Sequence, residues 1–143
     1  MCFLGYSGAA TGLALEVKDY LREMLPLLRI IDWRWNFQIG QALFAQIEQT
    51  SEKCDFAIFL ITKDDDLMQP SGTLASSPRD NIVFEVGFFA ARMGMENTLL
   101  IVEQGAKLPS DWGGILYIPL KDRADISAVK MMVYSALKDR LNS

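Results

Sequence analysis

An uninterrupted run of six apolar residues, FAIFLI at positions 56–61, constrains the fold of this chain more than any other feature. The run is rich in β-branched and aromatic residues, lies between Asp55 and Thr62, and is shorter than a typical helix. It does not alternate with polar residues, which is typical of a strand covered on both faces. The run therefore predicts an α/β domain with a parallel central sheet.

The remainder of the chain alternates between strand-like and helical patterns, as expected for a parallel sheet with helices on both faces. Further strands are predicted at residues 2–4, 27–31, 98–102 and 115–118, and helical spacing appears in 13–24, 39–47, 81–93 and 129–141. Met131 and Met132 are expected in the core. We expect one domain spanning residues 1–143, of a size that also suits one piece of a longer protein.

Composition excludes several kinds of site. The chain has no histidine and only two cysteines, so a Ser-His-Asp triad, a Cys-His pair and a zinc site are not expected. Cys2 and Cys54 are predicted to be reduced core residues. The net charge of −4 without a basic cluster, and the absence of a long apolar run or signal peptide, predict a cytoplasmic protein that binds neither nucleic acid nor membranes. No cofactor or metal is expected.

Glu85 is the main candidate for a functional carboxylate. The segment 81–91 is apolar on nearly every side of the predicted helix, and Glu85 is its only ionisable residue before Arg92. A buried carboxylate is costly unless it is paired, so an ion pair with Arg79 is one interpretation. The helix also follows a strand by a loop, which places its start at the sheet edge where ligands bind in such folds. That position favours a functional carboxylate, with Asn81 one turn away.

Other segments that follow predicted strands should reach the same edge. They are the turn 5–8, an aromatic loop at 33–37 and the acidic run 64–66. The aromatic residues also suit packing in the core or a self-association surface, and the acidic run also suits a solvated turn.

Four segments in order resemble a bacterial TIR-like family. They are FLGYSG at 3–8, DFAIFLITKDD at 55–65, SPRDNIVFEVGFF at 77–89 and LPSDWGG at 108–114. TIR domains of this kind serve as effectors in the cyclic-nucleotide-triggered antiphage systems CBASS and Pycsar, including TIR–STING fusions. The resemblance implies a flavodoxin-like TIR fold and an NAD+ glycohydrolase (NADase) that releases nicotinamide and ADP-ribose or a cyclic form.

The resemblance places the family's essential glutamate on Glu85. It also implies activation by self-association, with a cyclic-nucleotide sensor domain as a fused or separate partner. Substrate-binding residues expected around Glu85 are Gly5, Tyr6, Ser7, Gly8, Trp33, Arg79, Asn81 and Asp111, and expected interface residues are Trp35 and Phe37. Tyr6 and Trp33 are the candidates for stacking on a base of the substrate. Gly5 to Gly8 would bind its phosphates through backbone N–H groups. Two alternatives stay open, namely a non-enzymatic TIR adaptor and a nucleoside deoxyribosyltransferase-like enzyme.

Overall fold

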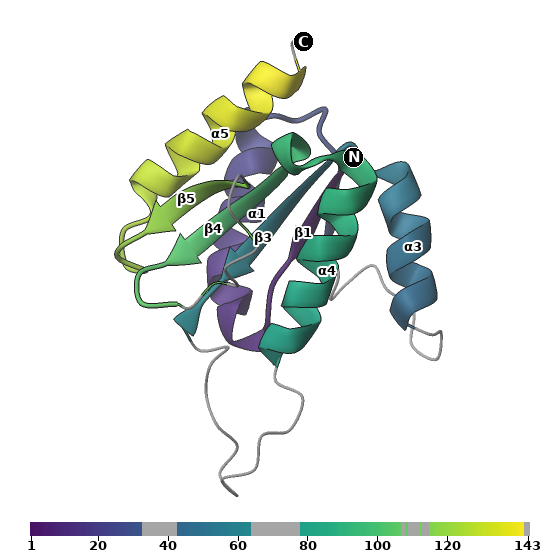
Figure 1. Cartoon of the computed structure of the whole chain (residues 1–143). Helices are drawn as coiled ribbons and strands as arrows, with labels where there is room; N and C mark the ends of the chain where they lie inside the picture. Colours follow the sequence, from purple (N-terminus) through teal and green to yellow (C-terminus); the bar gives the residue numbers. More distant parts are fainter. Residues whose placement is uncertain (33–42, 64–77, 107, 109–111, 113–114, 142–143) are drawn as a thin grey trace, which may run out of the picture.

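The computed structural model describes residues 1–32, 43–63, 78–106, 108, 112 and 115–141. The described segments form a five-stranded, all-parallel sheet in the order β2-β1-β3-β4-β5 (Figure 1). The strands are β1 (Cys2–Gly5), β2 (Ile30–Asp32), β3 (Phe56–Ile61), β4 (Thr98–Glu103) and β5 (Leu116–Leu120). The predicted α/β fold with a parallel sheet of about five strands is confirmed.

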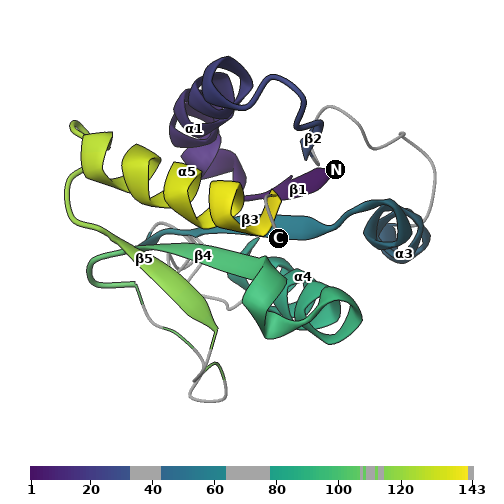
Figure 2. The same ribbon diagram turned by 90° about the horizontal axis from the view of Figure 1, so that it is seen from above.

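Helices cover both faces of the sheet (Figure 2). One face carries α1 (Thr11–Met24) and α5 (Ser127–Leu141), and the other carries α3 (Leu43–Lys53) and α4 (Pro78–Met93). Two short 3₁₀ helices, η1 (Gly8–Ala10) and η3 (Met95–Asn97), precede α1 and β4. No helix within the described segments is both long and apolar enough to cross a bilayer.

The core consists of two layers because successive side chains of a strand point to opposite faces. In β3, the residues Phe56, Ile58 and Leu60 pack toward α1 and α5. Ala57, Phe59 and Ile61 pack toward α4. All six are buried, which confirms that this run is a central strand covered on both sides. Cys2 and Cys54 are buried free thiols, as predicted.

Several boundaries differ from the sequence-based prediction. The second strand begins at Ile30 rather than at residue 27, because Leu28 N–H donates to the Leu25 carbonyl (2.9 Å) and closes a turn around Pro26. Leu27 is 96% exposed in that turn. Helix α4 begins at Pro78, before the expected residue 81, since proline suits the first helical position.

The prediction for the methionines of the C-terminal helix is wrong. Helix α5 buries Val129, Val133 and Leu137 against the sheet, whereas Met131 is 65% exposed and Met132 is 45% exposed. The core-facing residues recur every four positions, and the two methionines fall between them on the outer surface.

Candidate functional site

The strand order places a topological switch point between β1 and β3 at the carboxyl edge of the sheet. After β1 the chain crosses to α1 on one face, and the helix that follows β3 along the chain, α4, lies on the other face. The connections that leave these two neighbouring strands therefore lead to opposite faces of the sheet, and in open α/β sheets ligands bind in the crevice outside such a switch point. The turn after β1 and the beginning of α4 flank this switch point.

Glu85 lies on the buried face of α4. It shares that face with Ile82, Val86 and Phe89, spaced so that all four side chains point toward the sheet. Glu85 is 6% exposed, and among the described residues its carboxylate makes no hydrogen bond or ion pair. Removal from water raises the pKa of this carboxyl from its ordinary value of 4.5 to about 7.

Aromatic packing fixes how far Glu85 lies from the sheet edge. The Phe89 ring stacks on Phe3 of β1 (centroids 4.4 Å apart) and meets the Phe59 ring edge-on (5.7 Å). Four residues toward the start of α4 is a rise of about 6 Å, which matches about two residues along a strand. Because α4 runs opposite to β1, this step leads from the level of Phe3 to that of Gly5, at the carboxyl end of β1.

The turn after β1 is closely packed. A Cβ atom on Gly5 would lie 2.6 Å from Cδ1 of Phe59, so a glycine is required beside that ring. The Ser7 carbonyl accepts a hydrogen bond from Ala10 N–H (3.0 Å), which joins the turn to η1. Ser7 is buried, and its hydroxyl has no hydrogen-bond partner among the described residues. A buried polar atom of this kind usually has a partner, and a bound ligand could supply it.

Tyr6 lies inside the core rather than at the surface of the crevice. Its ring is 1% exposed, and its hydroxyl lies 2.7 and 2.9 Å from the carboxylate oxygens of Asp32, at the end of β2. In this structure Tyr6 is therefore a core residue, and we do not assign it to base stacking.

Lys18 of α1 completes this buried polar group through an ion pair with Asp32 (Nζ to Oδ2, 3.1 Å). This pair was not predicted from the sequence. A signal was present, because Lys18 falls within the apolar stripe of its helix beside Val17 and Leu21, and Asp32 directly follows two isoleucines.

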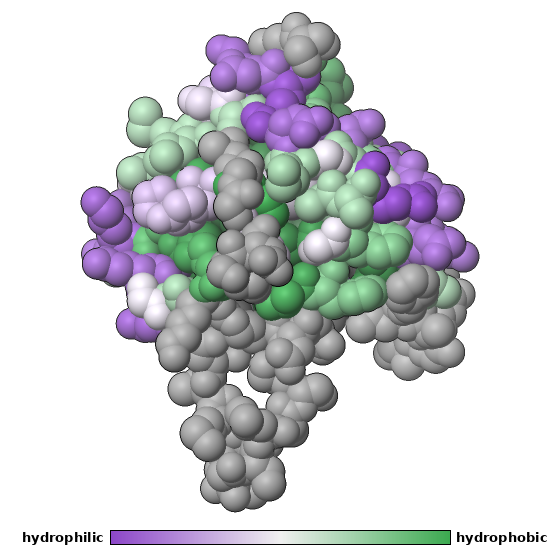
Figure 3. Space-filling model, viewed as in Figure 1, coloured by the Kyte–Doolittle hydropathy of each residue, from purple (hydrophilic) through white to green (hydrophobic). Residues whose placement is uncertain are grey.

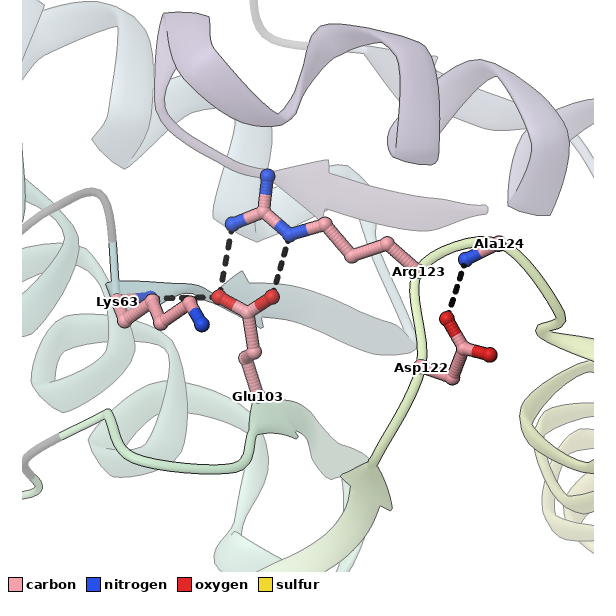
Figure 4. A network of polar contacts seen from close by, with 5 residues as sticks. All are labelled: Lys63, Glu103, Asp122, Arg123 and Ala124. Atoms are coloured by element: carbon pink, nitrogen blue, oxygen red, sulfur yellow. Dashed lines mark hydrogen bonds and ion pairs between the residues drawn. The ribbon is translucent and has the colours of Figure 1, made fainter.

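Glu103 at the end of β4 is a second carboxylate that the sequence analysis missed. It accepts two hydrogen bonds from Arg123 and one from the Lys63 N–H (2.9 Å), so it links the ends of β3, β4 and β5 (Figure 4). The hydrogen bonds from Arg123 hold the pKa of Glu103 below its usual range.

The pKa values of Glu85 and Glu103 can be compared directly because each residue is 6% exposed. Glu103 is paired and has a lowered pKa, whereas Glu85 has a raised one. A buried carboxylate that has no partner among the described residues and lies near a switch point is the kind of group that marks a functional site.

The remaining predicted site residues are described in part or not at all. Gly8 begins η1 at the crevice. Arg79 and Asn81 belong to the first turn of α4, but their side chains lie outside the described part of the chain. Also outside it are Trp33, Trp35, Phe37, the acidic run 64–66 and Asp111.

Residues 2–122 match the family described as "CAP12/Pycsar effector protein, TIR domain". The chain is 36% identical over 111 residues to the Pycsar effector protein BcPycTIR of Burkholderia cepacia, a match that covers 74% of this chain and 36% of that protein. It is 33% identical over 116 residues to the CD-NTase-associated protein 12 of Niabella drilacis, covering 79% and 37%. The chain thus spans about a third of the length of these curated relatives.

Among solved structures, a prokaryotic SEFIR domain aligns over 94% of this chain and 90% of its own, with a TM-score of 0.58 and 16% identity. That similarity supports the fold alone. The family match covers most of the chain, and the relatives agree with it. The chain therefore belongs to the TIR-domain family of the CAP12 and Pycsar effectors, a family of antiphage-defence effectors.

Proposed function

We propose that this domain is an NAD+ nucleosidase of bacterial antiphage defence and that Glu85 is its catalytic carboxylate. The observation that carries the proposal is the burial of Glu85 near the β1–β3 switch point, with no hydrogen bond or ion pair to any described residue. A structural carboxylate would have a partner, as Glu103 has Arg123. Membership of the effector family adds the biological setting.

The reaction breaks the bond between the nicotinamide nitrogen and C1′ of the ribose. The bonding electron pair leaves with nicotinamide, which departs neutral, and positive charge develops on the ribose as an oxocarbenium-like centre. Water then adds to C1′ and loses a proton, giving ADP-ribose. Since the leaving group needs no proton, a histidine is not required, and one ionised carboxylate can stabilise the charge that develops.

Other residues at the switch point would bind the substrate around Glu85. The hydroxyl of Ser7, which has no partner among the described residues, would bond to a substrate oxygen, and backbone N–H groups of the Gly5–Gly8 turn would face the phosphates. Arg79, Asn81, Trp33 and Asp111 stay predictions for the same site.

Activation by self-association is part of the proposal. Trp35 and Phe37 are its predicted interface residues. The names of the relatives, CD-NTase-associated and Pycsar effector proteins, suggest that a cyclic-nucleotide signalling system controls the assembly. Figure 3 shows apolar surface over α4, where Phe84 is 47% exposed.

The test is nicotinamide release from NAD+, followed by chromatography over a series of protein concentrations. We expect release by the wild type that rises more steeply than linearly with protein concentration. The Glu85→Gln variant should be inactive, and Glu96→Gln, a matched control in the exposed η3 segment, should be as active as the wild type. If the wild type releases no nicotinamide even when fused to an oligomerising module, the proposal is wrong and the non-enzymatic adaptor becomes the favoured alternative.

A further inference from the structure

A buried polar triad lies behind the turn that flanks the crevice. It consists of Tyr6, Lys18 and Asp32, which we call the Asp32 triad. The three side chains come from the end of β1, from α1 and from the end of β2, and the residues are 1%, 6% and 2% exposed, respectively. Asp32 accepts hydrogen bonds from both the Tyr6 hydroxyl (2.7 Å) and the Lys18 ammonium (3.1 Å).

Stability alone does not account for such a group. Removing two charges from water is costly, and apolar residues of similar volume often give an equally stable or more stable core. A polar triad does differ from an apolar one in being directional, because its hydrogen bonds hold only at short distances and good angles. The triad therefore restricts Tyr6 to one position, and Ser7 is the next residue.

The opposite side of the same turn is held by packing. Gly5 lies against the Phe59 ring, and Phe59 contacts Phe89 of the helix that carries Glu85. The turn is thus fixed to α4 on one face of the sheet, and to α1 and β2 through the triad on the other face.

We propose that Asp32 is a positioning residue, which holds the Ser7 turn in register with Glu85 through Tyr6 and Lys18. The proposal rests on the function proposed above for Glu85. Asp32 itself would not touch the substrate, because both of its carboxylate oxygens face the Tyr6 hydroxyl and the Lys18 ammonium inside the core.

The test replaces the whole triad, so that neither the Asp32 carboxylate nor the Lys18 ammonium is left in the core without the other. The triple variant Tyr6→Phe, Lys18→Met, Asp32→Leu is expected to fold, with a Tm within a few degrees of the wild type. Its kcat/KM for nicotinamide release should fall at least tenfold. Val133→Ala, which removes buried volume from α5, is the control for general destabilisation and should keep kcat/KM within twofold at temperatures where it is folded. A folded triple variant with a kcat/KM within twofold of the wild type would overturn the proposal.

Hydrogen exchange gives a readout that does not need activity. The Ala10 amide donates to the Ser7 carbonyl, so its exchange reports on the turn. We expect the Ala10 amide to exchange at least tenfold faster in the triple variant. In Val133→Ala, the ratio of the Ala10 exchange rate to the rate of exchange through global unfolding should be the same as in the wild type. Unchanged exchange at Ala10 would overturn the proposal.

The single variant Tyr6→Phe keeps the ring and removes only the hydroxyl, so it replaces the triple variant in both measurements if the triple variant does not fold. It should lose at least threefold in kcat/KM and show faster Ala10 exchange, and no change in either measurement would overturn the proposal. If the wild type releases no nicotinamide, the proposed function fails, and Ala10 exchange alone then decides whether the triad positions the turn.

Discussion

Replacing Glu85 by glutamine should abolish activity and at the same time stabilise the fold at alkaline pH. Burial raises the pKa of Glu85 from 4.5 to about 7. Between these two pH values the folded state keeps a proton that the unfolded state releases. Stability is therefore greatest below about pH 4.5 and falls as the pH rises through 7. Above pH 7 the folded protein holds an ionised carboxylate in its core that has no ion-pair partner among the described residues.

The magnitude follows from the two pKa values. At about 1.4 kcal/mol per pH unit, the ionised carboxylate lowers the free energy of unfolding by about 3 kcal/mol at pH 8 and by about 1 kcal/mol at pH 5. Glutamine does not ionise and has nearly the same shape. Glu85→Gln should therefore be more stable than the wild type by these amounts, and the gain should be larger at pH 8 by about 2 kcal/mol.

Urea or guanidinium unfolding at pH 5 and pH 8 measures this difference. Glu103→Gln is the matched control, because Glu103 is equally buried but paired with Arg123. Its lowered pKa gives stability that is present at pH 8, so this variant should be less stable than the wild type there. The reasoning is refuted if Glu85→Gln is no more stable than the wild type at pH 8, or if its gain is the same at both pH values.

Three further predictions follow from the same structure. Gly5→Ala would place a Cβ atom 2.6 Å from the Phe59 ring and should cost about 1–3 kcal/mol in urea unfolding; a neutral effect would contradict the packing. The kcat/KM for NAD+ should rise with pH around a midpoint near 7, as Glu85 becomes ionised in the free enzyme; a flat profile from pH 5.5 to 8.5 would exclude that role. Trp35→Ala and Phe37→Ala should lower activity in dilute protein and recover it at high concentration; a loss that is independent of concentration would remove these residues from the interface.

The central features of the fold were predictable from local patterns. The apolar run at 56–61 and the alternation around it are enough to specify a parallel sheet covered on both faces. The boundary errors have local causes. Pro26 favours a turn that delays β2, and the outward methionines of α5 belong to a helix whose apolar residues are not confined to one side.

The candidate site was only partly predictable. Glu85 was recognisable because an isolated carboxylate in an apolar helix is conspicuous in the sequence. The pairing of the Asp32 triad and of Glu103 with Arg123 was not predictable, because the partners lie between 12 and 26 residues apart along the chain, and only the folded sheet brings them together. The burial of Tyr6 likewise depends on Asp32, which is 26 residues away.

The most direct test of the account is the rate of nicotinamide release from NAD+ at pH 8 by the wild type and by Glu85→Gln at the same protein concentration. At that pH the variant is predicted to be the more stable of the two, so a loss of activity would not reflect unfolding. The account predicts release by the wild type and a rate at least about 100-fold lower for the variant, as expected when a charge that stabilises the transition state is removed. Equal rates for the two proteins would contradict it.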